Sequence, residues 1–195
     1  MATNDVPIGQ MTPESQWGEF NSQAFIIQQF INKVQTCTLV RVDAVTNNGD
    51  VSPVGFVNVT PLVNQVDAQG LPTPHVTIFN VPYMRLQGGA NAVIIDPKVG
   101  DIGICTFASR DISKVKKTKG QANPGSARKY SYSDGLYIGG VLNGTPSQYI
   151  RFTNSGITVH SAGTVAIEAA TACNVTTPTF TVNGATVLNG PLTQG

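Results

Sequence analysis

Charged residues and cysteines are scarce in this chain of 195 residues, and long apolar runs are missing. Only 12% of the residues are charged and the formal net charge is +1, which argues against a nucleic-acid-binding surface covering the whole protein. The three cysteines, Cys37, Cys105 and Cys173, lie far apart without a Cys-x-x-Cys or Cys/His spacing. They therefore predict free thiols, not a disulfide framework or a zinc site. We expect neither a membrane-spanning helix nor a secretion signal, because no segment has the required apolar length or the required order of basic and apolar residues.

Catalytic motifs are also missing. The two histidines, His75 and His160, lie far apart, and neither belongs to an HExxH or HxH pattern. No GxSxG, GxxxxGK[ST] or GxGxxG motif occurs. Two pairs of acids occupy turn-like contexts, where Asp commonly accepts hydrogen bonds from backbone amides; they are Asp43 with Asp50 and Asp96 with Asp101. We therefore predict a protein that is not an enzyme and that binds no cofactor or metal.

What the sequence does contain is a C-terminal quarter, from Gln148 to Gly190, built of short runs in which apolar and small polar residues alternate. A period of two predicts strands that bury one face. After residue 140 the only formally charged side chains are Arg151 and Glu168, whereas threonine occurs eleven times. The predicted strands are Ile150–Phe152, Ile157–Val159, Val165–Ile167, Val175–Thr177 and Phe180–Val182.

Each of these strands offers too few inward aliphatic side chains to form a core within a single layer. Identical chains wound around a common axis would repeat each inward residue by symmetry and build a shared core. The alternative is that the segment forms half of an ordinary β-sandwich with other strands of the same chain. In either case His160 is expected to point outward, because it follows Val159 on the opposite parity.

The sequence predicts three domains: an N-terminal arm and helix over residues 1–35, a barrel over residues 36–140, and a C-terminal β segment over residues 141–195. Residues 1–13 carry Pro7, Gly9 and Pro13 and predict an extended arm. A helix should follow, with Thr12 as its cap and Pro13 in its first turn. Its apolar stripe would dock on another subunit or on its own domain; the residues are Trp17, Phe20, Ala24, Ile27, Ile31 and Val34.

The middle domain shows the pattern of five or six strands separated by turns. Such a set fits a small closed barrel, which leaves no exposed sheet edge, and its spacing is closer to the OB class than to a sandwich. The predicted strands are Cys37–Val42, Gly55–Val59, His75–Val81, Ala92–Ile95, Ile102–Phe107 and Gly135–Ile138.

Residues 110–129 interrupt this pattern with a basic loop. Seven of the twelve basic residues of the chain lie there, against the single acid Asp111. A basic loop on an OB-like barrel could bind nucleic acid or an anionic glycan, but this loop contains no aromatic residue for base stacking. A solvated loop, or one that faces acidic partners, is favoured. The basic residues are Arg110, Lys114, Lys116, Lys117, Lys119, Arg128 and Lys129.

Several segments resemble, in the same order, the central spike or cell-puncturing proteins of contractile-tailed phage baseplates. The resemblance covers roughly residues 36–190. It rests on three short elements, Pro-Leu-Val, Asn-Val-Pro and Gly-Asp-x-Gly, and on an Arg that is followed by aromatic residues and then by Ser-Asp. The β-rich segment comes after these elements. The matching segments are Val57–Val63, Ile78–Pro82, Gly100–Gly103, Phe107–Ile112, Ser126–Tyr130 and Ser133–Gly135.

The resemblance implies a mainly β fold: an N-terminal helix, an OB-fold-like barrel that trimerises and seats the spike on the baseplate hub, and a C-terminal intertwined trimeric β-helix. The protein would be a virion component of the tail baseplate, assembled in the host cytoplasm, and sheath contraction would drive the needle through the host outer membrane. By parity, the shared trimer core would contain Ile150, Phe152, Ile157, Val159, Val165, Ile167, Val175, Phe180, Val182 and Val187.

The chain departs from the family pattern at its C-terminal end. Many such spikes bind iron at the apex through histidines separated by one residue, and residues 189–195 contain no such pair. We therefore predict no apical iron site in this chain. A separate tip protein could cap the needle, the spike could be blunt, or the sequence could be truncated. No lysozyme domain is present.

Two other functions remain open. An OB-fold binding module could hold single-stranded nucleic acid or glycan through the basic loop, although we expect no nucleic acid partner. A β-helical enzyme acting on polysaccharide is disfavoured, because it needs a cluster of acids on one face and the C-terminal segment contains only Glu168.

Overall fold

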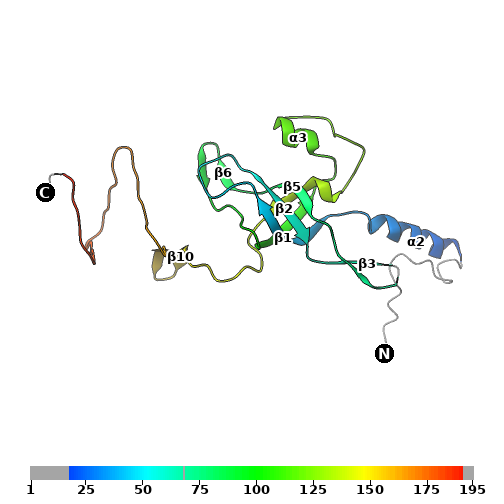
Figure 1. The fold of residues 1–195 in the computed structure, drawn as a ribbon, viewed down its shortest axis with the longest axis horizontal. Coiled ribbons are helices and arrows are strands. Elements are labelled where there is room, and N and C mark those ends of the chain that lie inside the picture. The colour runs from blue at the N-terminus through cyan, green and yellow to red at the C-terminus, as the bar shows by residue number, and fades with distance from the viewer. Residues whose placement is uncertain (1–17, 68, 191–195) are drawn as a thin grey trace, which may run out of the picture. The chain divides into compact units, whose positions relative to one another are not determined.

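A computed structural model describes residues 18–67 and 69–190 of the chain. The chain divides into two units, Met1–Gly144 and Thr145–Gly195, which are treated separately below. The first unit is mainly β, as predicted, with a curled antiparallel sheet and few helices (Figure 1). The predicted extended arm and the predicted helix cap at Thr12 and Pro13 lie outside the described residues.

The predicted N-terminal helix is present as α2, Glu19–Ile31. It begins after Gly18, whose φ of 96° is a conformation that glycine adopts easily, and it ends at Asn32. None of its residues is buried. Phe20 is 81% exposed and Phe30 67%, so much of the apolar surface of α2 is exposed. No helix in the described ranges is long and apolar enough to cross a membrane.

The main sheet has five antiparallel strands in the order β5-β2-β1-β8-β9. Alternate residues of β2 and β8 are buried, as expected for strands with one face on a core. Valines dominate that core because β-branched side chains fit the pleated surface of a sheet; it includes Val40, Val42, Val57, Val59 and Val81. The strands are β1 (Cys37–Val45), β2 (Phe56–Pro61), β5 (Ile78–Pro82), β8 (Ile102–Phe107) and β9 (Gly135–Ile138).

The sheet curls into a half-barrel. Irregular pairing between Val42 and Ala44 and between Val57 and Val59 bends its central strands. The two edge strands then meet at one point, where Tyr83 and Tyr137 form an isolated parallel bridge. The N–H of Met84 donates to the Tyr137 carbonyl oxygen over 2.9 Å. The structure thus confirms a curled β-sheet, but it forms a half-barrel instead of the fully closed barrel predicted from the sequence.

Short elements surround the half-barrel. They include two hairpins, β3 (Gln65–Val66) with β4 (Pro72–Thr73), and β6 (Leu86–Gly88) with β7 (Asn91–Val93). The sequence predicted only the last of these strands, because the predicted strand Ala92–Ile95 overlaps β7. The basic segment, predicted to be a loop, contains the helix α3 (Ser113–Thr118). A 3-10 helix, Tyr132–Asp134, leads directly into β9.

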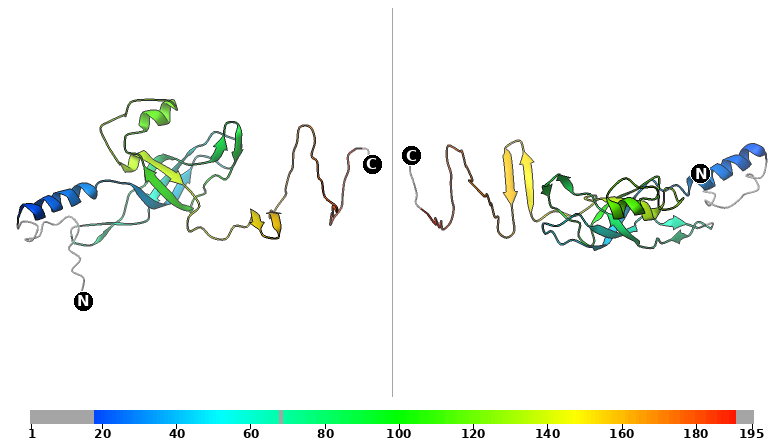
Figure 2. Two further views of the ribbon diagram at one scale, coloured as in Figure 1. Left: turned by 180° about the vertical axis from the view of Figure 1, so that it is seen from behind. Right: turned by 90° about the horizontal axis from the view of Figure 1, so that it is seen from above.

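The second unit contains one hairpin, β10 (Tyr149–Thr153) with β11 (Gly156–His160). Beyond it, residues 161–190 run back and forth without forming a helix or a paired strand (Figure 2). The three strands predicted within that range are therefore not formed in the single chain. A strand needs a hydrogen-bonded neighbour, and the chain provides none there.

Candidate functional site

The β10–β11 hairpin carries four of the ten predicted core residues on one face. Its register pairs Ile150 with Val159 and Phe152 with Ile157. Because side chains alternate across a strand, all four point to the same side. In the single chain they are exposed, from 59% for Val159 to 73% for Phe152. An isolated two-stranded hairpin is marginally stable in water, so packing of this apolar face against another surface would stabilise it.

The other six predicted core residues lie on the unpaired segment after β11. Their exposure ranges from 51% for Val182 to 80% for Val187. Within residues 161–190 the structure shows no hydrogen bond between backbone groups. The hydrogen bonds there are local and involve side chains, such as the Gly163 N–H to Ser161 Oγ and the Thr177 hydroxyl to the Thr179 carbonyl oxygen. The six residues are Val165, Ile167, Val175, Phe180, Val182 and Val187.

The opposite face of the hairpin is polar, and some of its side chains pack against one another. The rings of Tyr149 and His160 stack with centroids 5.1 Å apart, and Arg151 lies over the Tyr149 ring at 5.8 Å. His160 thus lies on the face opposite Val159, as the alternation predicted. Within the described ranges, no group of three or more His, Cys, Asp or Glu side chains could hold a metal ion.

In the first unit, a buried ion cluster holds the basic segment 110–129. The Arg128 guanidinium binds two carboxylates: Nη2 lies 2.8 Å from Asp111 Oδ1, and Nε lies 2.7 Å from Asp134 Oδ2. Both carboxylates are almost fully buried. The backbone N–H of Ile112 donates to Asp134, and the Oγ of Ser126 donates to Asp111. The cluster therefore joins the start and the end of the segment to the edge of the sheet.

The same contacts keep both carboxylates ionised. Hydrogen bonds from Ser113 and Ser126 lower the pKa of Asp111 to about 2, and the nearby positive charge of Arg128 acts in the same direction. Burial acts to raise the pKa of Asp134, but the hydrogen bonds from Arg128 and the Ile112 N–H outweigh it and hold that pKa below its usual value. These acids therefore act as structural partners of Arg128, and they do not resemble a proton-transfer pair.

A second buried ion pair joins Arg85 to Asp96, with Nη2 and Oδ1 2.6 Å apart. The Tyr83 hydroxyl donates to the same carboxylate at 2.7 Å, and Arg85 also donates to the carbonyl oxygen of Ser52. Asp96 is thus fully engaged, which agrees with the structural role predicted for it. Asp101 of the same predicted pair accepts a hydrogen bond from the backbone N–H of Lys98.

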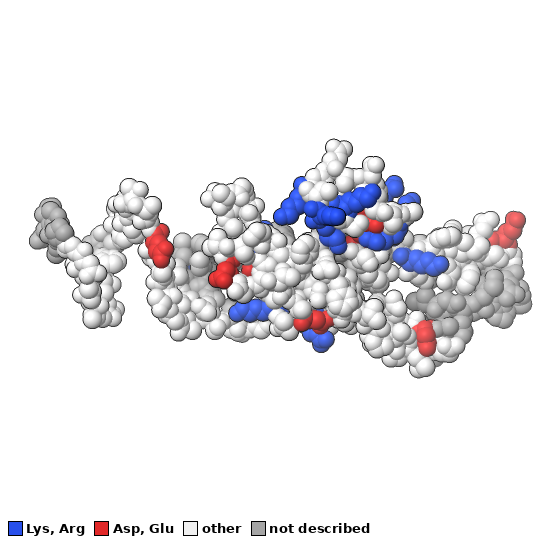
Figure 3. Space-filling model, turned by 45° about the horizontal axis from the view of Figure 1, so that its top comes forward, with Lys and Arg blue, Asp and Glu red and all other residues white. Residues whose placement is uncertain are grey.

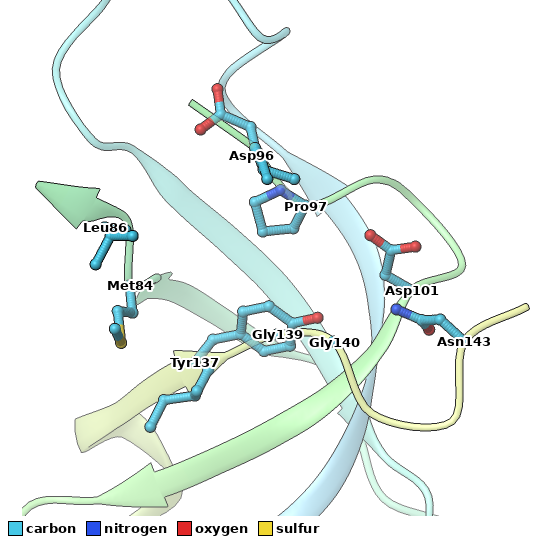
Figure 4. Close-up of a pocket in the computed structure, with 11 residues that line it drawn as sticks. Met84, Leu86, Asp96, Pro97, Asp101, Tyr137, Gly139, Gly140 and Asn143 are labelled. Atoms are coloured by element: carbon cyan, nitrogen blue, oxygen red, sulfur yellow. The ribbon is translucent and has the colours of Figure 1, made fainter. Parts of the chain in front are cut away.

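A pocket of about 330 Å³ lies beside the point where the half-barrel edges meet (Figure 4). Its wall is mostly apolar, with Met84, Leu86 and Pro97, and the ring of Tyr137 reaches into it from β9. Tyr137 is 1% exposed, and its hydroxyl has no hydrogen-bond partner among the residues that the structure describes. Burial raises the pKa of this phenol to about 12, so it stays neutral. Gly103 permits this packing, because a Cβ there would lie 2.6 Å from the ring.

The ion clusters were not predicted from the sequence. Asp111, Arg128 and Asp134 are separated by many positions, and charge patterning alone assigned Arg128 to the solvated basic loop. The available signal was the resemblance, because each of these three residues lies in one of its matching segments. No family model matches the chain, and no curated protein matches it either.

Proposed function

We propose that the protein is the central spike of a contractile injection machine, a phage tail or a related bacteriocin. Three copies would wind their C-terminal segments into a trimeric β-helical needle. The half-barrel would be an OB-fold-like collar that seats the needle on a baseplate hub protein. Sheath contraction would then push the needle through the host outer membrane, without catalysis and without a bound cofactor.

The observation that carries this proposal is the state of residues 145–190 in the single chain. All ten predicted core side chains are more than half exposed. Burying an aliphatic side chain fully is worth roughly 1.5 to 3 kcal/mol, so assembly around a shared axis would gain a large free energy from this one segment. The same assembly would provide neighbours for the unpaired backbone after β11. A sandwich with the half-barrel finds no support, because the core face of that sheet is already filled by its own valines.

The proposed machine also accounts for the low charge of the needle segment. A rigid, interlocked trimer resists a mechanical load best when no free sheet edge can start unfolding.

The protein would be assembled in the host cytoplasm and carried in the virion at the tail baseplate. A separate tip protein would be a further partner of the needle.

The mass of the protein in solution tests the proposal. Light scattering during size-exclusion chromatography should give about three times the 20.5 kDa chain mass, unchanged between low and high salt. Ile157→Asp should abolish the trimer by placing a carboxylate in the shared core. Thr158→Asp is the matched control, because its side chain lies on the opposite face of β11, and it should leave the mass unchanged.

A monomer at all protein concentrations would rule out the spike. The runner-up is then a binding module that uses the basic segment, which the observed cluster of cations favours. Titration with single-stranded nucleic acid or anionic glycan would test it, since phosphate binding weakens steeply with salt.

A further inference from the structure

The basic segment 110–129 presents a set of unpaired cations on one side of the first unit. Figure 3 shows Lys and Arg gathered over α3 and its flanking loop. Arg128 is used internally by the two buried carboxylates. Lys116 donates to the carbonyl oxygens of Asn80 and Ser133. Five exposed cations remain, and within the described part of the chain none forms an ion pair; they are Arg110, Lys114, Lys117, Lys119 and Lys129.

The fold fixes the segment that carries these cations. The cluster around Arg128 fixes both ends of the segment, and Lys116 ties α3 to the sheet. Lys114 and Lys117 lie three residues apart on α3, where side chains are neighbours on the helix surface and like charges repel one another. That repulsion costs free energy in the unbound protein and is relieved when an anion binds. The arrangement therefore favours an anionic partner.

An apolar pocket of about 420 Å³ borders this patch. Its walls come from the β1–β2 connection, the end of β5 and α3, with Val54, Phe56, Met84 and Val115 among them. Lys119 belongs to both the pocket lining and the set of free cations. A side chain bound in the pocket would therefore bring its neighbours along a chain within reach of the lysines.

The chemistry of the two features selects the ligand. Nucleic acid is disfavoured because residues 110–129 contain no aromatic ring for base stacking, and the two aromatic residues of the pocket lining, Phe56 and Tyr83, are half-buried and buried. The nearby Tyr132 is already packed edge-on against Phe107 and His75. A flat anionic membrane would meet the lysines but would leave the concave apolar pocket empty. A peptide segment that carries several carboxylates around one large aliphatic residue fills both features.

We infer that the basic segment and the adjoining pocket bind an acidic peptide segment of another protein, anchored by one aliphatic side chain. The carboxylates would contact Lys114, Lys117 and Lys119, and the anchor would enter the pocket beside Val115. The inference rests on charge and shape in the first unit alone.

Fluorescence anisotropy on the full chain tests the inference with designed probes. The principal probe is a labelled peptide of Asp and Glu residues with one central leucine. One control peptide replaces leucine by serine, and another replaces every acid by its amide. A labelled oligothymidylate is the nucleic acid probe. The leucine peptide should bind about tenfold more tightly than the serine peptide, its affinity should fall with salt, and the amide peptide should not bind.

Matched variants locate the surface. The double variant Lys117→Glu with Lys119→Glu should lower the affinity for the leucine peptide about tenfold or more. Lys98 is an exposed lysine outside the segment, and Lys98→Glu should not lower this affinity. Val115→Asp should remove the preference for leucine over serine. Three results would overturn the inference: equal binding of the amide peptide, equal weakening by Lys98→Glu, or tighter binding of oligothymidylate than of the leucine peptide, which would assign the surface to nucleic acid. Absence of peptide binding at low salt would overturn it as well.

Discussion

The half-barrel and the C-terminal segment use the same kinds of residue to opposite effect. In the half-barrel, Val40 and Val59 are fully buried by other strands of the same chain. In the C-terminal segment, Val165 and Val182 alternate with polar residues in the same way but are more than half exposed. The difference teaches that alternation specifies which face of a strand seeks burial, while the number of neighbouring strands in the chain decides whether that burial is intramolecular.

The sharpest test of this comparison places a carboxylate in each region. Val59→Asp should unfold the half-barrel, because burying an unpaired charge costs more than the few kcal/mol by which small domains are stable. Val182→Asp should leave the melting of the half-barrel unchanged and should lower only the assembled mass. Circular dichroism melting and light scattering measure the two effects. Loss of the half-barrel in Val182→Asp would show that the two regions are not independent.

Breaking the Arg128 cluster should have the next largest effect. Asp134→Ala leaves the guanidinium without one of its two carboxylates and should destabilise the first unit by about 3 kcal/mol. Urea unfolding measures this change, and hydrogen exchange should show faster opening of residues 110–129. Asp50→Ala, at an exposed turn, is the control and should change little. Unchanged exchange in Asp134→Ala would mean that the cluster does not hold the segment.

Acid should loosen the half-barrel before it affects the proposed needle core. The folded-state pKa of Asp111, about 2, lies below the usual value for Asp. A depressed carboxyl pKa contributes stability that is present above about pH 4 and is lost as the pH falls towards 2. The apolar face of β10–β11 contains no carboxylate. Unfolding titrations from pH 5 to pH 2 should show this loss in the first unit, and Asp111→Asn should flatten it. An equal loss in that variant would assign the acid sensitivity elsewhere.

The smallest effect is expected at Tyr137. Its hydroxyl is buried without a partner, so Tyr137→Phe removes a desolvated polar group and should stabilise the first unit, by up to about 1 kcal/mol. Urea unfolding of the variant is the measurement. Destabilisation by more than that amount would reveal a hydrogen bond to this hydroxyl that forms in solution, within the pocket that it faces.

The predictable parts of the fold were those with a regular period. The bounds of β8 and β9 agree with the alternating runs Ile102–Phe107 and Gly135–Ile138. The strands β3, β4 and β6 escaped prediction because strands of two or three residues are too short to show a period, whereas β7 overlaps the predicted strand Ala92–Ile95. The helix α3 was not predicted, because its lysines indicated a loop. The Arg128 cluster could not be found from the sequence alone, because it depends on tertiary contacts between residues far apart.

The candidate site was predictable to a different extent in each unit. Alternation correctly placed Ile150, Phe152, Ile157 and Val159 on one face, because a hairpin inherits its pattern from the pleat. It could not determine what covers that face. The pocket beside Lys119 draws its walls from α3 and from strands far away in the sequence, so only the folded chain brings them together.

The missing backbone partners of residues 161–190 have a consequence for how the molecule would be made. A half-barrel that closes on its own contacts folds at a rate independent of concentration. A segment whose partners belong to other copies must wait for encounters, so its ordering in the proposed trimer would speed up as the protein becomes more concentrated. Newly synthesised chains would thus pass through a stage in which the half-barrel is folded and the C-terminal segment is still unpaired. If three copies associate through their half-barrels, as proposed, their C-terminal segments would experience a high effective concentration and would wind together in register.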